Sequence, residues 1–199
     1  MRLGLLGGTF NPIHIGHLLL AESAREQCGL DAVWFVPTAV PPHKGSRELA
    51  AGAHRLAMVR LALRAHASFM ASELELRREG VSYTIDTIQG LRERYPRRAL
   101  LLIVGSDMLD VEWFRMDVLR RLCTFAVARR STGKGECAAE RPGRRSGSSP
   151  RRSKIHWLRM PLVDISSSMI RARVQHGQSI RYLVPDAVAR YIARHRLYR

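Results

Sequence analysis

The 199-residue sequence has no long hydrophobic run and few cysteines. No stretch approaches the roughly 18 apolar residues that would span a bilayer. The opening MRLGLLGGTF runs into glycines before it could form the apolar core of a signal peptide. Cys28, Cys123 and Cys137 lie far apart and form no CxxC pair, which is typical of a reducing compartment. These absences predict a cytoplasmic protein with no membrane contact.

Acidic residues are also scarce: 17 Asp and Glu stand against 33 Lys and Arg, for a net charge of +16. Such a charge favours an anionic partner, nucleic acid among them. Much of it lies between Arg129 and Lys154, where Arg alternates with Gly, Ser and Pro and apolar residues are too few to fold alone. This segment contains no aromatic residue that could stack on a base. We therefore expect a loop over about 129–154 and no dedicated nucleic-acid site, although a basic nucleic-acid-binding protein stays open as an alternative.

Apolar segments of strand length alternate with segments of helical period along the chain. Several strand candidates are apolar throughout, which is typical of a parallel sheet buried on both faces. The sequence thus predicts one α/β domain over 1–199, a doubly wound, Rossmann-like parallel sheet with helices on both faces. Such sheets bind ligands beyond the carboxyl ends of their strands. Strands are expected over 2–8, 32–38, 99–107, 124–130 and 155–161, with 69–76 strand-like, and helices over 17–29, 53–66, 84–95, 164–177 and 184–195.

The stretch GGTFNPIHIGH joins the first predicted strand to the first predicted helix. Gly7 and Gly8 let a ligand approach the backbone closely, and Thr9 and its neighbouring amides can meet phosphate oxygens. Gly16 and His17 open the helix, whose N-terminus favours an anion. The stretch therefore suits a phosphate-bearing ligand.

His14 and His17 are three residues apart and can face the same site. Two imidazoles beside a phosphate could donate hydrogen bonds to charge that develops during group transfer. The alternatives are a pair of surface or capping histidines and, less favoured, a zinc site, for which no third ligand lies near.

The stretch ISSSMIRARV supplies a second helix start. Serines 166, 167 and 168 suit an N-cap, and first-turn amides bind phosphate. Arg171 lies one turn further and can hold a phosphate in a bidentate manner. Together the two stretches predict two helix N-termini on either side of one triphosphate.

The letters H-I-G-H from His14 to His17 occur in class I aminoacyl-tRNA synthetases and in nucleotidylyltransferases. The chain lacks the KMSKS loop of the synthetases, the GxGxxG dinucleotide fingerprint and the P-loop. ISSSMIR instead is similar to the I-S-S-T-x-I-R signature of nucleotidylyltransferases. From Leu3 to about Ile192 the sequence resembles bacterial nicotinate-nucleotide adenylyltransferases, through the motifs GGTFNPIHIGH, FVPTAVPPHK, GVSYTIDT, LLLIVGSDML and ISSSMIRARVQHGQSIRYLVP.

The resemblance implies transfer of the adenylyl group of ATP to nicotinate mononucleotide, which forms deamido-NAD and pyrophosphate. The implied partners are these two substrates, with Mg²⁺ carried by ATP and no metal site of the protein's own. A homo-oligomer is left open. Other acceptors, such as nicotinamide mononucleotide or phosphopantetheine, remain alternatives within the same chemistry.

The resemblance also implies roles for individual residues. The backbone amides of Tyr83 and Thr84 would take the nicotinate carboxylate, and Trp113 would stack on the pyridine ring. Asn11 and Ser168 stand where many relatives have Asp and Thr, which keeps a small polar side chain at each position. The implied catalytic residues are His14, His17 and Arg171; the ATP site adds Gly7, Gly8, Thr9, Phe10, Gly16, Asp107, Ile165, Ser167 and Ser168; the mononucleotide site comprises Thr9, Asn11, Lys44, Tyr83, Thr84 and Trp113.

Overall fold

The computed structural model describes residues 1–40, 49–78, 80–108, 113–128 and 155–199. Lys44, Cys137 and the expected loop over about 129–154 lie outside these ranges. The elements, in chain order, are β1 Arg2–Gly8, α1 Ile15–Cys28, β2 Ala32–Pro37, α2 Gly52–Leu63, β3 Phe69–Ala71, α3 Thr84–Arg94, β4 Ala99–Gly105, the 3₁₀ helix η2 Ser106–Met108, α4 Met116–Leu122, β5 Thr124–Ala128, β6 Ile155–Leu158, α5 Ser167–Gln175 and α6 Asp186–Arg194.

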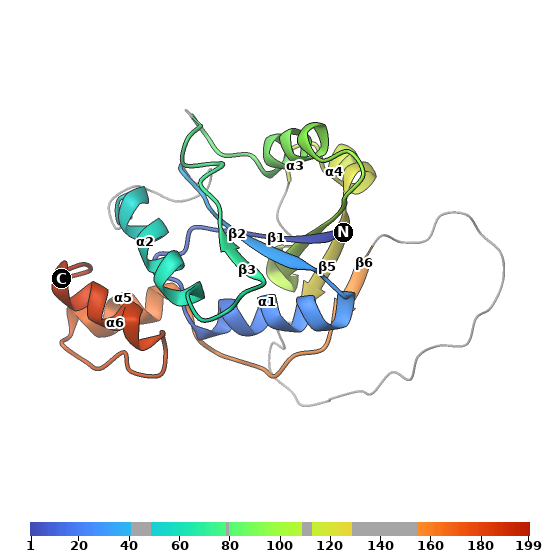
Figure 1. The fold of residues 1–199 in the computed structure, drawn as a ribbon. Helices are drawn as coiled ribbons and strands as arrows, with labels where there is room; N and C mark the ends of the chain where they lie inside the picture. The colour runs from blue at the N-terminus through green and yellow to red at the C-terminus, as the bar shows by residue number, and fades with distance from the viewer. Residues whose placement is uncertain (41–48, 79, 109–112, 129–154) are drawn as a thin grey trace.

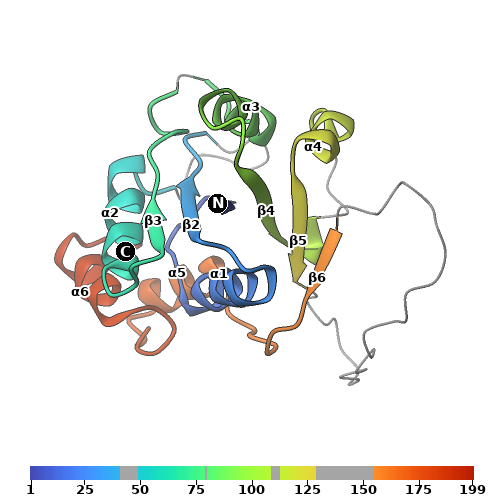
Figure 2. The ribbon, with the colours of Figure 1, turned by 45° about the vertical axis from the view of Figure 1, so that its right-hand side comes forward.

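Six strands form one sheet in the order β3-β2-β1-β4-β5-β6, and every neighbouring pair is parallel. Helices cover both faces: α3 and α4 lie on one side of the sheet, and α1, α5 and α6 on the other (Figures 1 and 2). Because side chains alternate along a strand, the central strands β1, β2, β4 and β5 each contribute to two cores. Leu6, Phe35 and Ile103 pack toward α1 and α2, whereas Leu5, Leu102 and Val127 pack toward α3 and α4. The predicted fold class is confirmed.

The strand order reverses direction between β1 and β4, which are neighbours at the centre of the sheet. The connections after the two strands therefore leave toward opposite faces, and a crevice opens beyond their carboxyl ends. The residues that follow β1 belong to GGTFNPIHIGH, and those that follow β4 belong to LLLIVGSDML. The topology brings these two motifs to the same edge of the sheet.

Two helix ends have the caps that the sequence predicts. Gly29 ends α1 in the left-handed conformation, with φ 58°, and its N–H donates to the carbonyls of Arg25 and Glu26. Ser166 is the N-cap of α5, where its Oγ accepts the N–H of Met169 at 3.1 Å.

Three elements differ from the sequence expectation. The strand-like stretch 69–76 forms a strand only over Phe69–Ala71 and then turns. The last strand ends at Leu158 because both backbone groups of Arg159 bond to the Gln27 side chain on α1. The short helix α4 has no counterpart among the predicted elements. No helix within the described ranges is long and apolar enough to cross a membrane.

Candidate functional site at the central edge of the sheet

The start of α1 holds the two motif histidines against each other. His14 is the N-cap residue and His17 lies in the first turn. The backbone N–H of His14 donates to Nδ1 of His17 at 3.2 Å, and the N–H of His17 donates to the His14 carbonyl at 3.0 Å. The two imidazoles stack with their centroids 3.7 Å apart. The rings therefore form one unit at the N-terminus of a helix.

The capping bond also defines the hydrogen on the His17 ring. A backbone N–H can only donate, so Nδ1 of His17 must be the unprotonated nitrogen. In the neutral imidazole the hydrogen is then on Nε2, which makes Nε2–H the donor of this ring. The capping hypothesis and the catalytic hypothesis for His17 are thus compatible, because each uses a different nitrogen.

Two glycines of the motif lie close against aromatic rings. A Cβ on Gly16 would lie 3.1 Å from Nδ1 of His14, and a Cβ on Gly8 would lie 3.2 Å from the ring of Phe10. Phe10 in turn is buried and meets the His17 ring edge-on at 5.0 Å. A Cβ on Gly7 would meet nothing within 4 Å. Gly8 and Gly16 thus shape the site, whereas open space adjoins Gly7.

The start of α5 is tied to the loop that precedes α1. Ser167 donates its hydroxyl to the carbonyl of Pro12 at 2.8 Å, and Nη1 of Arg171 donates to the carbonyl of Asn11 at 3.1 Å. These bonds join residues about 155 to 160 positions apart in the sequence. The two helix starts expected beside one triphosphate are therefore adjacent in space.

Asn11 and Thr9 are fixed by contacts from α2 and its approach. Asn11 is buried, and its Oδ1 accepts the N–H of Ala50 at 3.1 Å. Arg55 is 1% exposed and donates to the carbonyls of Thr9, Ala50 and Ala39, at 2.8, 2.9 and 3.3 Å. Burial lowers the pKa of the Arg55 guanidinium from its ordinary value. Arg55 thus connects the segments that follow β1 and β2.

The start of α3 lies beside the segment that follows β2. Ser82 accepts the N–H of Ala39 on its Oγ at 3.1 Å, and its own N–H donates to the carbonyl of Val40 at 3.2 Å. Tyr83 is the N-cap residue and Thr84 the first residue of the helix. Because first-turn N–H groups have no acceptor within a helix, this terminus suits a carboxylate. Asp86 lies in the first turn, with Oδ2 3.9 Å from the Arg78 guanidinium.

A buried carboxyl supports this helix start. Glu75 is 4% exposed and accepts the hydroxyl of Thr87 at 2.9 Å. Burial raises the pKa of the Glu75 carboxyl, while the hydrogen bond from Thr87 and the charge of Arg78 act in the opposite direction. Glu75 thus fixes the first turns of α3 from beneath.

Trp113 is engaged with the core. Its indole N–H donates to the carbonyl of Met108 at 2.5 Å, and its ring meets Phe125 edge-on at 6.4 Å. The neighbouring Phe114 is 58% exposed and its ring lies 4.9 Å from that of Tyr83, which is 37% exposed. An exposed aromatic pair therefore stands beside the start of α3, next to the tryptophan that the sequence singled out.

The remaining predicted site residues are placed as follows. Ser168 is exposed in the first turn of α5, and Ile165 packs at the edge of the core just before it. Asp107 lies in η2 directly after β4, but its side chain is outside the described part of the structure. Lys44 also lies outside the described residues.

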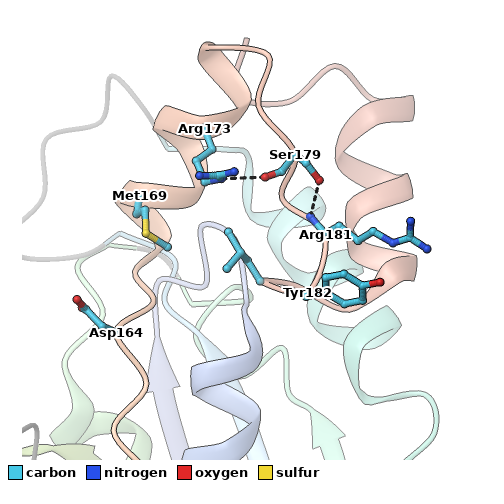
Figure 3. Close-up of a pocket in the computed structure, with 7 residues that line it drawn as sticks. Asp164, Met169, Arg173, Ser179, Arg181 and Tyr182 are labelled. Carbon is cyan, nitrogen blue, oxygen red and sulfur yellow. Dashed lines mark hydrogen bonds between the residues drawn. The ribbon is translucent and has the colours of Figure 1, made fainter.

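A separate pocket of about 450 Å³ flanks α5 (Figure 3). Met169 and Arg173 of α5 face it, and Nε of Arg173 donates to the carbonyl of Ser179 at 2.8 Å. The predicted site residues are not among those that line it, which are Asp164, Met169, Arg173, Ser179, Arg181, Tyr182 and Leu183. Among the described residues, no group of three His, Cys, Asp or Glu side chains could hold a metal ion.

Sequence reasoning missed four residues that contact the predicted site or its supports: Arg55, Glu75, Phe114 and Tyr198, whose hydroxyl donates to Oδ1 of Asn11 at 2.9 Å. Arg55 interrupts an otherwise apolar helical face, and Glu75 lies between two leucines. In both cases the sequence weakly indicates a buried polar side chain. Phe114 and Tyr198 had no such signal.

The comparisons with known proteins agree on one family for this chain. A model of the cytidylyltransferase-like family matches residues 5–173. The chain is 45% identical to a protein of Exiguobacterium sibiricum and 43% identical to one of Salinibacter ruber, both described as probable nicotinate-nucleotide adenylyltransferases. Each match covers all of this chain and at least 98% of the relative. The fold is similar to that of a Plasmodium falciparum nicotinic acid mononucleotide adenylyltransferase complexed with NaAD, with a TM-score of 0.77, 19% identity, and coverage of 99% of this chain and 97% of that one.

Proposed function

Because the chain belongs to the nicotinate-nucleotide adenylyltransferase family, we propose that its reaction takes place where β1 and β4 end. The enzyme joins ATP and nicotinate mononucleotide to form nicotinate adenine dinucleotide (NaAD) and pyrophosphate. The observation that best supports this location is the stacked pair of His14 and His17 at the start of α1. The loop before this pair is bonded to Arg171 of α5.

The reaction is one in-line displacement at phosphorus. A phosphate oxygen of nicotinate mononucleotide forms a bond to the α-phosphorus of ATP, and the bond from that phosphorus to the bridging oxygen of pyrophosphate breaks. The nucleophile is already an anion, so no general base is required. The protein's task is to position two anionic substrates and to stabilise the charge that develops.

Positioning two substrates in line accounts for about 7–11 kcal/mol of the barrier. Nε2–H of His17 and the guanidinium of Arg171 are suited to phosphate oxygens that gain charge, and one well-aimed donor contributes about 3–4 kcal/mol. Mg²⁺ enters with ATP as part of the substrate and neutralises charge on the polyphosphate. The first-turn amides of α5 add a positive helix end on the same side.

The start of α3 is the proposed acceptor site. The backbone amides of Tyr83 and Thr84 can donate to the nicotinate carboxylate. Nicotinamide mononucleotide would have to turn an NH₂ donor toward these donors, which costs on the order of 1–3 kcal/mol per unsatisfied group. Phe114 beside Tyr83 offers an aromatic surface next to the pyridine ring, in addition to Trp113.

We also propose that the reaction takes place in the cytoplasm. Cys28 and Cys123 are buried and form no disulfide bond, as is usual for a reducing compartment.

The test is a pyrophosphate-release assay with ATP and three separate acceptors, with the nucleotide product identified by mass. Nicotinate mononucleotide should give NaAD at the highest kcat/KM, at least about a hundredfold above its amide. Phosphopantetheine should give no product. Equal use of acid and amide would exclude the proposed carboxylate site but not the adenylyl transfer, whereas turnover of phosphopantetheine alone would contradict the function.

A further inference from the structure

The loop between β1 and α1 is held by a residue that follows α6. Oδ1 of Asn11 accepts two hydrogen bonds, one from the N–H of Ala50 at 3.1 Å and one from the hydroxyl of Tyr198 at 2.9 Å. The main-chain carbonyl of Asn11 accepts the bond from Arg171. Asn11 therefore joins the approach to α2, the helix α5 and the segment after α6 within one buried residue.

Tyr198 is held by contacts of both its ring and its hydroxyl. Its ring packs against the core that lies under α1 and α2, and its backbone is in the left-handed region with φ 64°. Its hydroxyl interacts electrostatically with Arg171 and with Arg55. Burial raises the pKa of the Tyr198 hydroxyl above its ordinary value, so the group stays protonated and donates to Asn11.

These contacts form a chain from Tyr198 to the reaction site. Asn11 is flanked by Phe10, whose ring meets His17, and by Pro12, whose carbonyl accepts the Ser167 hydroxyl. A shift of Asn11 would move the acceptor of the Arg171 bond and the ring that supports His17. Misplacing a catalytic group by about 1 Å can reduce the rate of a positioned reaction by about a hundredfold.

We propose that Tyr198 is a positioning residue for adenylyl transfer: through its hydrogen bond to Asn11 it fixes the loop that carries the motif histidines and the acceptor for Arg171. The proposal rests on the location of the reaction given above. Tyr198 touches no reacting atom and acts through Asn11.

The first test compares Tyr198→Phe with Tyr191→Phe. Each removes one hydroxyl and keeps the ring, but the Tyr191 hydroxyl bonds to Nδ1 of His54 at 2.9 Å, between α6 and α2. Losing one hydrogen bond that positions the site should lower kcat about fivefold to tenfold in Tyr198→Phe and change KM for either substrate by less than about twofold. Tyr191→Phe should keep wild-type kinetics. Equal kcat in Tyr198→Phe and wild type would overturn the proposal.

A double-mutant cycle with Asn11→Ala tests the route. If Tyr198 acts through Asn11, Tyr198→Phe should change kcat by less than about twofold once the Asn11 side chain is gone. The same fivefold loss in both backgrounds would show that Tyr198 acts elsewhere and would overturn the proposal.

Amide hydrogen exchange of the peptide spanning residues 8–17 gives a measurement that does not depend on activity. Exchange should be faster in Tyr198→Phe than in wild type and unchanged in Tyr191→Phe. If exchange of this peptide were the same in Tyr198→Phe and wild type, the positioning role would be rejected, whatever the activity of the variant. Failure of wild-type protein to form NaAD would instead reject the proposed function and leave the exchange result to decide the role of Tyr198.

Discussion

Replacing His17 separates its two uses, because Nδ1 caps the helix and Nε2 carries the hydrogen. His17→Ala removes the acceptor for the His14 N–H and the stacking partner of the His14 ring. Loss of a cap of this kind costs about 1 kcal/mol, which lowers Tm by about 2–4 °C for a chain of this size. Loss of a donor to the transferring phosphate should lower kcat at least about a hundredfold, equivalent to about 2.7 kcal/mol.

His17→Glu is the matched control. Glutamate at the third helical position is the usual partner in a capping box and reaches back to the N-cap N–H. Its charge is also favourable at a helix N-terminus. His17→Glu should therefore recover the Tm lost in His17→Ala, yet have a still lower kcat, because a carboxylate repels the phosphates.

The assay is thermal unfolding of the three proteins together with steady-state kinetics for ATP and nicotinate mononucleotide. The ranking of the three proteins by Tm should differ from their ranking by kcat. The Tm of His17→Glu should be near that of wild type and above that of His17→Ala. The kcat should be highest in wild type and lowest in His17→Glu. If kcat followed Tm, with His17→Glu close to wild type, His17 would be a capping residue and its proposed part in the transfer would be refuted.

Three further outcomes follow from the structure and sequence. Trp113→Ala should raise KM for nicotinate mononucleotide and for its amide by a similar factor in kinetic assays, since ring contacts do not distinguish acid from amide; a changed ratio would assign discrimination to the indole. Glu75→Gln should gain stability relative to wild type as pH rises above about 4.3, the ordinary pKa of a glutamate, because a raised pKa in the folded state means that the ionised wild-type carboxyl is costly to bury. Urea unfolding of both proteins at pH 5 and pH 8 measures this difference. A greater loss of unfolding free energy in the variant than in wild type between pH 5 and pH 8 would contradict it. Deleting residues 132–149 should leave kcat/KM within about twofold and weaken retention on heparin, because the segment carries cationic side chains outside the motifs; a large loss of transfer at unchanged Tm would give the segment a part in the reaction.

The sequence by itself determined the architecture and predicted where the reaction takes place. Fully apolar strands such as Ala99–Gly105 can only be buried on both faces, so a parallel sheet with two helical layers follows from composition and order. Gly29 and Ser166 mark helix ends because their backbone and side-chain chemistry is local. The phosphate site after β1 could likewise be predicted, because its glycines, helix start and two histidines are close together in the sequence.

The contacts that fix the site were decided by the tertiary structure, because their partners are far apart in the sequence. Tyr198 reaches Asn11 across 187 positions and Arg171 reaches it across 160. Arg55 donates to carbonyls in the segments after β1 and β2 and so connects them. The residues next to Arg55 in the sequence do not predict that its guanidinium has three carbonyl acceptors. A short-range sequence pattern shows which polar groups are present. Only the packing of the sheet and helices determines which of these groups form a hydrogen bond with each other.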